Sequence, residues 1–160
     1  MKNDFSFRHG ILGMGGLICF IAAALCLSPA ELFAEDYAAA LKRAKAEDKA
    51  LVLYFYSKYC PYCVAMERDV LADREIANIM KFKVVSLRID VEARPDLATK
   101  YGIRGYPSTC FMEPSGKVII RVPGYVDKKE FGILLEYAKE KHYKTTALRD
   151  YLKKAGVKFN

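Results

Sequence analysis

The chain has few of the side chains that build metal sites. It holds two histidines, His9 and His142, and five cysteines among 160 residues. Zinc sites usually take four ligands, and the single C-x-x-C at residues 60–63 has neither a second C-x-x-C nor a neighbouring histidine pair. We therefore predict no metal and no cofactor. So few cysteines also argue against a small fold held together by disulfides.

The chain also lacks internal repeats, low-complexity segments and nucleic-acid-binding motifs. Apolar residues make up 52% and charged residues 28% of the sequence, which is enough to bury the core of one globular domain. The net charge is +7, and it suits solubility or attraction to acidic partners or an anionic membrane surface. We predict a monomer without a nucleic-acid partner.

An uncharged apolar segment follows Lys2 and Arg8 and covers residues 10–27. This pattern predicts that residues 1–34 are a secretory signal peptide, cleaved after Ala30 or Ala34. The alternative is an uncleaved membrane anchor through residues 10–27, because about 20 apolar residues can span a bilayer. Either outcome places the rest of the chain in the periplasm or another exported location.

Two of the five cysteines, Cys19 and Cys26, lie within that apolar segment, where they act as small hydrophobic residues. The residues before them, Ile18 and Leu25, are not the small residues of a lipid-attachment site. The exported domain therefore keeps three cysteines. A redox pair plus one buried thiol, Cys110, is the simplest interpretation, and a third redox cysteine is the alternative.

Helical and strand patterns alternate along the remaining sequence. Helices are expected at 35–48, with acidic residues in the first turn, and at 64–80, with Asp73 capping its continuation; strands are expected at 50–56 and 83–89. Asp96 is expected to cap a short helix at 97–101, before a hairpin of strands 109–112 and 118–122. Asp127 opens a long helix, and a last helix covers 146–155. The order predicts an α/β fold with a central mixed sheet, βαβ plus antiparallel ββα, flanked by helices.

The two thiols of Cys60-Pro61-Tyr62-Cys63 stand one helical turn apart, directly after the predicted buried strand. A helix is expected to begin at the first of them, where unpaired N–H groups favour a thiolate. Such sites bring a cysteine pKa from about 8.5 to about 3.5–7.5, and a thiolate is the nucleophile of disulfide exchange.

Beyond the cysteines, the stretch 101–108 (Tyr-Gly-Ile-Arg-Gly-Tyr-Pro-Ser) and the turn glycines Gly116 and Gly124 complete a pattern that resembles the thioredoxin superfamily, in particular secreted or periplasmic thioredoxin-like oxidoreductases. The resemblance covers residues 35–142, which we predict to be a thioredoxin-like domain. Residues 143–160 are then a C-terminal helical extension.

The resemblance implies a role for each residue around the dithiol. Cys60 would be the nucleophile, Cys63 the resolving thiol and Pro107 a cis-proline beside them. The residues expected to contact substrate are Tyr59, Pro61, Tyr62, Tyr106 and Ser108. The alternative for the tyrosines is that they only cover the core.

Two positions depart from the thioredoxin pattern. Tyr54 stands six residues before Cys60, where thioredoxins carry a buried carboxylate, and Ser86 stands near the place of its basic partner. A tyrosine, with a reference pKa of about 10, is a poor base near neutrality. Either water, Glu67 or Lys58 then assists the resolving thiol, or exchange at Cys63 is slower than in thioredoxins.

These features predict an exported thiol:disulfide oxidoreductase that exchanges its Cys60–Cys63 disulfide with protein substrates. We favour a reductase supplied by a membrane electron carrier, because an inserted helical domain typical of DsbA-type oxidases and a dimerisation domain typical of DsbC-type isomerases are both missing. The alternatives are the oxidase or isomerase direction, a copper- or zinc-binding thioredoxin-fold module, and a binding domain without redox work.

Overall fold

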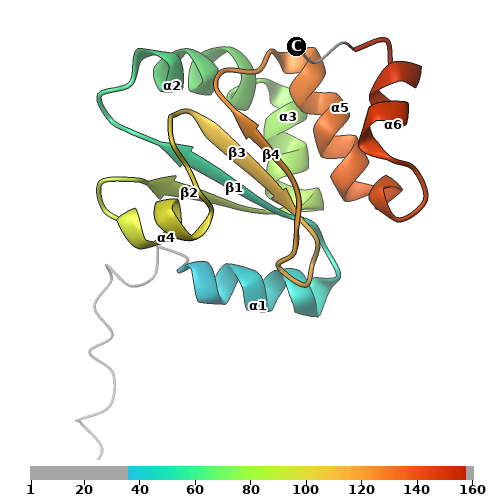
Figure 1. Cartoon of the computed structure of the whole chain (residues 1–160), viewed down its shortest axis with the longest axis horizontal. Helices are drawn as coiled ribbons and strands as arrows, with labels where there is room; N and C mark the ends of the chain where they lie inside the picture. Colours follow the sequence, from blue (N-terminus) through green and yellow to red (C-terminus); the bar gives the residue numbers. More distant parts are fainter. Residues whose placement is uncertain (1–35, 158–160) are drawn as a thin grey trace, which may run out of the picture. The chain divides into compact units, whose positions relative to one another are not determined.

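The computed structural model describes residues 36–157, so the predicted signal peptide or anchor lies outside the described residues. A four-stranded mixed sheet with the strand order β2-β1-β3-β4 forms the centre of the domain (Figure 1). The strands are β1 (Leu51–Tyr56), β2 (Val85–Asp90), β3 (Ser108–Met112) and β4 (Val118–Pro123). The α-helices are α1 (Tyr37–Glu47), α2 (Pro61–Met66), α3 (Arg74–Asn78), α4 (Pro95–Lys100), α5 (Lys128–Lys139) and α6 (Leu148–Lys154).

The strand pairing confirms the predicted βαβ and ββα halves. β1 pairs parallel with β2 and antiparallel with β3, and β3 and β4 form the hairpin that ends the sheet. In this register Tyr54 stands between Arg88 of β2 and Thr109 of β3. The thioredoxin fold expected from the sequence is therefore the fold observed.

The sheet is buried on both faces, and alternate residues of β1 separate the two cores. Val52 and Tyr54 join a core with α5 and the helices that follow the cysteines, whereas Leu51, Leu53 and Phe55 join a core with α1 and α4. Figure 1 shows α1 and α4 on one side of the sheet and α2, α3 and α5 on the other. A strand covered on both faces must be apolar throughout, which explains the uninterrupted run that predicted β1.

Two of the three predicted aspartate caps are confirmed. Asp73 accepts hydrogen bonds from the backbone N–H groups of Glu75 and Ile76, and Asp127 accepts one from that of Glu130. The prediction for Asp96 was wrong. Proline favours the first helical position, and Pro95 takes it, so α4 begins earlier and Asp96 lies inside its first turn.

The helical segment after the cysteines is less continuous than predicted. α2 passes into a π-helical turn, η2 (Glu67–Leu71), and α3 passes into a second one, η3 (Ile79–Lys83). The first helix also differs from the prediction, because it begins after Asp36 and has no acidic residue in its first turn.

The C-terminal extension packs back on the domain. It contains a 3₁₀ turn, η4 (His142–Lys144), and α6, and Leu152 of α6 is buried in the same core as Phe131 of α5. The Tyr151 ring lies 4.9 Å from that of Tyr137. None of the helices between residues 36 and 157 is long and apolar enough to cross a membrane.

Candidate functional site

The two cysteines lie at the junction between β1 and α2. Cys60 is the N-cap residue of α2, and Pro61 occupies the first helical position that proline favours. The backbone N–H of Cys63 donates to the Cys60 sulfur at 3.2 Å, which stabilises negative charge on that sulfur. This local geometry brings together the two residues predicted to carry the chemistry.

The two thiols differ in exposure. Cys60 is partly exposed, whereas Cys63 is only 2% exposed, and both are free thiols. Burial, followed by a hydrogen bond with Cys60, raises the pKa of Cys63 to about 11. Hydrogen bonds from the Ser57 backbone and the Tyr54 side chain act in the opposite direction. An outer sulfur open to attack and an inner sulfur that keeps its proton are the two parts of a dithiol exchange site.

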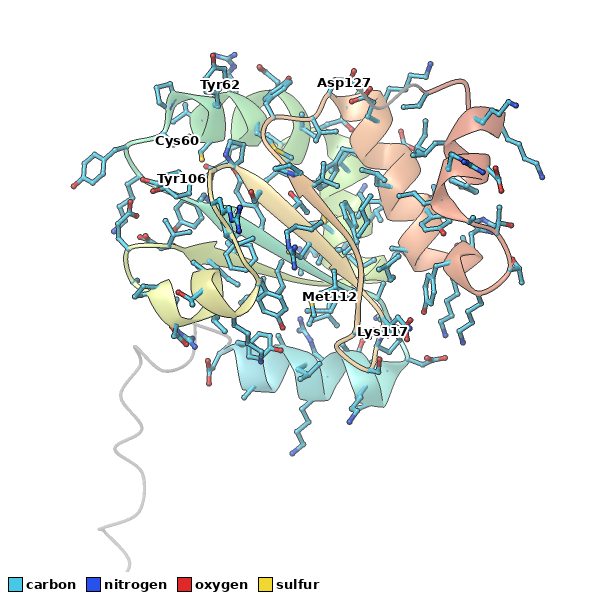
Figure 2. The ribbon with its side chains drawn as sticks, in the orientation of Figure 1. Cys60, Tyr62, Tyr106, Met112, Lys117 and Asp127 are labelled. Carbon is cyan, nitrogen blue, oxygen red and sulfur yellow. The ribbon has the colours of Figure 1, made fainter. Side chains whose placement is uncertain are left out.

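The loop before β3 closes one side of this site. Its Tyr106–Pro107 peptide bond is cis, and the backbone carbonyl oxygen of Tyr106 accepts a hydrogen bond from the Cys60 thiol at 3.3 Å. Figure 2 shows Tyr106 next to Cys60, at the start of α2. The carbonyl oxygen of Pro107 accepts from the Gly124 amide at 2.7 Å, which ties the loop to the end of β4.

Ser108, a predicted substrate contact, has its hydroxyl bonded within this loop. It is buried, and its hydroxyl donates to the Gly105 carbonyl oxygen at 2.7 Å. Its side chain therefore supports the loop from within.

Aromatic side chains surround Cys60 on the surface. Tyr59 is 86% exposed, Tyr62 68% and Tyr106 45%, so these rings do not merely cover the core. Pro61 is exposed beside them. We call Tyr59, Tyr62 and Tyr106 the tyrosine rim.

Sequence reasoning missed a further exposed ring near the site, that of Tyr125. It follows Gly124, whose amide bonds to the cis-proline loop. The only local signal was its position directly after a glycine at the end of a predicted strand.

Tyr54 lies directly behind Cys63. Its hydroxyl donates to the Cys63 backbone carbonyl oxygen at 3.3 Å, and its ring stacks on Tyr56. Burial is the main cause that raises the pKa of Tyr54, so this side chain stays a neutral phenol. It stands in the predicted position and is not a base.

An ion pair next to Tyr54 was also missed by the sequence analysis. A guanidinium nitrogen of Arg88 donates to the Glu67 carboxylate, and the guanidinium lies 4.9 Å from the centre of the Tyr56 ring. Ser86, the position first compared with the thioredoxin pattern, instead donates to the Met80 carbonyl oxygen. The basic residue beside Tyr54 is thus Arg88, its partner in the β1–β2 register.

A cleft of about 500 Å³ opens on this side of the sheet, between β2 and the helical segments that follow Cys63. Its lining consists of Tyr54, Glu67, Leu71, Ala72, Ala77, Met80, Lys81, Ser86 and Arg88. The cleft therefore connects the residues behind Cys63 with the protein surface.

Cys110 is buried in β3, opposite Leu53 of β1, as predicted for a structural thiol. Burial raises the pKa of Cys110. Cys110 belongs to the core between the sheet and α1 and α4, whereas Tyr54 and Met66 of α2 belong to the core on the opposite face of the sheet. Within residues 36–157, no three His, Cys, Asp or Glu side chains gather as a group that could hold a metal ion.

The mixed sheet, the dithiol at the start of α2 and the cis-proline loop define a thioredoxin-fold domain. The family model described as "Thioredoxin-like domain" matches residues 37–139, and the chain belongs to that family. The match ends before η4 and α6, the elements of the C-terminal extension.

Curated relatives include Thioredoxin-1 of Drosophila melanogaster, 33% identical over 73 residues, which are 46% of this chain and 65% of that protein. They also include the thiol:disulfide interchange protein DsbD of Pseudomonas fluorescens, 32% identical over 111 residues, which are 65% of this chain and 18% of that protein. The chain thus spans less than two thirds of either relative.

Among solved structures, a thioredoxin-fold protein from Helicobacter pylori matches with a TM-score of 0.62 and 21% identity, over 69% of this chain and 81% of that one. At this identity the likeness concerns the fold.

Proposed function

We propose that this protein is an exported thiol:disulfide oxidoreductase that acts on cysteines of other proteins. The observation that carries the proposal is the asymmetric pair at the start of α2, a partly exposed Cys60 in front of a buried Cys63. The relationship to a thiol:disulfide interchange protein and to thioredoxins supports the same chemistry.

The reaction follows from the positions of the two sulfurs. The Cys60 thiolate attacks one sulfur of a substrate disulfide, and the other substrate sulfur leaves as a thiolate. Cys63 then attacks Cys60 in the mixed disulfide, which releases the second substrate sulfur and leaves a Cys60–Cys63 disulfide. Two electrons pass from the dithiol to the substrate.

Substrate binds across the tyrosine rim and the exposed Pro61 beside it. The cis-proline loop adds a backbone contact, because the Tyr106 carbonyl lies at the Cys60 sulfur and can accept from an extended peptide in place of the thiol. Pro107 has no backbone N–H, which leaves the Tyr106 backbone free to pair with an extended substrate.

The favoured direction is reduction of substrate. Between residues 36 and 157 the fold carries no inserted helical domain of the kind that DsbA-type oxidases have. A membrane electron carrier would then re-reduce Cys60–Cys63. The export signal or anchor in residues 1–34 and the domain limits at 34/35 and 142/143 remain predictions from the sequence.

Trapping tests this function directly. Cys63→Ala, produced in its own compartment with its N-terminal segment intact, should accumulate mixed disulfides through Cys60, seen as reductant-sensitive bands in gels. Cys60→Ala is the matched control and should trap nothing. Identifying the trapped proteins names the substrates, and the absence of any Cys60-dependent adduct would contradict the proposal.

A further inference from the structure

The resolving step requires Cys63 to lose a proton inside the protein. Cys63 is buried, and burial is the largest cause of the rise of its pKa to about 11. Near neutrality the thiol therefore needs an acceptor for its proton before it can attack.

Tyr54 separates Cys63 from the cleft but cannot accept that proton. Burial first, and then the charges of Cys63 and Glu67, raise the pKa of Tyr54, so a tyrosinate does not form. Its hydroxyl donates to the Cys63 carbonyl oxygen, and its side chain lines the cleft together with Glu67. The phenol therefore positions the backbone of Cys63 and takes no proton from the thiol.

Glu67 is the carboxylate nearest to this arrangement along the chain. It lies one helical turn after Cys63, and its backbone N–H donates to the same Cys63 carbonyl oxygen that accepts from Tyr54. The Glu67 side chain is 33% exposed, and Arg88 holds it by an ion pair across the cleft. Its carboxylate therefore reaches both the Tyr54 side of the cleft and bulk solvent.

The other candidate acceptors are occupied elsewhere. Lys58 pairs with Asp90 at 3.2 Å, and most of its side chain is in solvent. Glu92 accepts a hydrogen bond from the Ser57 hydroxyl at 2.6 Å, and it does not line the cleft. Glu92 is thus a carboxylate bonded to the loop before Cys60 but outside the cleft, and it serves as the control below.

We propose that Glu67, positioned by Arg88 at the cleft, accepts the proton that the Cys63 thiol loses when it resolves the mixed disulfide. The S–H bond of Cys63 breaks and the proton passes beside Tyr54, through solvent in the cleft, to the carboxylate. The freed electron pair forms the Cys60–Cys63 bond. The substrate sulfur keeps the electrons of the broken mixed disulfide and takes up a proton from solvent.

This inference rests on the proposed function and names the proton route of the same site. The charged and titratable groups that face Glu67 are Tyr54 of β1, Arg88 of β2 and Lys81 of η3, with Tyr56 beneath the guanidinium. No second carboxylate lines the cleft. Neutralising Glu67 therefore removes its only carboxylate acceptor.

Reaction of the reduced full chain with dithiobisnitrobenzoate separates the two steps. Cys19→Ser and Cys26→Ser are included so that only Cys60, Cys63 and buried Cys110 remain. Attack by Cys60 releases one thionitrobenzoate, and attack by Cys63 on the resulting mixed disulfide releases a second. Stopped-flow absorbance follows each release.

Glu67→Gln keeps the size of the side chain and its capacity to accept from Arg88. We expect the first phase to stay within about twofold of the wild type and the second to slow by at least about tenfold at pH 7. The second phase of the variant should then rise about tenfold per pH unit as hydroxide takes over, while the wild type rises less steeply. Glu67→Asp should recover part of the rate.

Glu92→Gln is the matched control and should leave both phases unchanged. Equal second phases and equal pH profiles for Glu67→Gln and the wild type would overturn the inference, and so would a loss confined to Glu92→Gln. Thermal unfolding of each variant checks that the fold is intact.

Failure of the proposed function has a different signature. If the wild type releases no more thionitrobenzoate than Cys63→Ser does, dithiol exchange itself is contradicted. If the wild type is biphasic but Glu67→Gln matches it in both phases, only the role of Glu67 is contradicted.

Discussion

The hydroxyl of Tyr54 donates a hydrogen bond to the backbone carbonyl oxygen of Cys63 at 3.3 Å. This contact joins the centre of β1 to the first turn of α2. Tyr54 stands in the place where thioredoxins carry a buried carboxylate. A neutral donor there supports the inner cysteine without offering a base. The proton must then leave by another group, which is why the cleft beside Tyr54 matters.

Removing this hydroxyl tests its contribution. Tyr54→Phe should lower the free energy of unfolding by about 1 kcal/mol, because a buried hydrogen bond is lost. It should also move the pKa of Cys63 further upward, since the Tyr54 hydrogen bond lowers it. Urea unfolding measures the first effect, and thiolate absorbance in a Cys60→Ser background the second.

Tyr56→Phe is the control for that substitution, because the Tyr56 ring stacks on Tyr54 while its hydroxyl is not the donor to Cys63. An unchanged Cys63 titration in Tyr54→Phe, or an equal change in Tyr56→Phe, would contradict the assigned contact.

The buried Cys63 thiol predicts a loss of stability in alkaline solution. Its pKa rises from 9.0 to about 11 on folding, so the folded protein holds this proton more tightly than the unfolded chain does. The stabilisation is complete below about pH 9 and disappears as the pH rises through about 11. Urea unfolding of reduced wild type and Cys63→Ala, compared across this range, should show the wild type losing its advantage. A constant difference at all pH values would contradict the burial effect.

The parts of the fold that local patterns encode could be predicted from the sequence. β1 is buried on both faces, so its run of apolar residues was sufficient to predict the strand. The Asp73 and Asp127 caps depend only on residues within one helical turn. The dithiol was predictable for the same reason. Asp96 shows the limit of such patterns, because the preceding proline shifted the helix start.

The Glu67–Arg88 pair could not be predicted in this way. Glu67 lies at the start of η2 and Arg88 lies in β2. The parallel β1–β2 register and the turn at η2 bring them together, and no short sequence pattern encodes that arrangement. Family comparison directed attention to Ser86 instead, whose hydroxyl bonds to the Met80 carbonyl oxygen. The bond of the Ser108 hydroxyl to the Gly105 carbonyl oxygen likewise depends on the shape of the loop and not on a short pattern.

The tyrosine rim predicts a defect confined to protein substrates. Tyr62 and Tyr106 are large exposed rings beside Cys60, and aromatic residues often supply more than 1 kcal/mol at binding surfaces. Tyr62→Ala and Tyr106→Ala should each raise KM for reduction of a protein disulfide by about fivefold to tenfold, while the first phase with dithiobisnitrobenzoate stays unchanged.

Phe82 provides a matched control for the rim variants, because it is 56% exposed and lies in η3. That turn leads into the start of β2, which pairs with the start of β1, whereas Cys60 follows the end of β1. Phe82→Ala therefore removes an exposed ring at the far end of the strand pair and should leave KM unaltered. An equal rise in KM for Phe82→Ala, or wild-type KM in both rim variants, would show that substrates do not bind across the tyrosine rim. A rise in KM limited to the rim variants, with Cys60 reactivity unchanged, would show that these rings bind protein substrates and take no part in the sulfur chemistry.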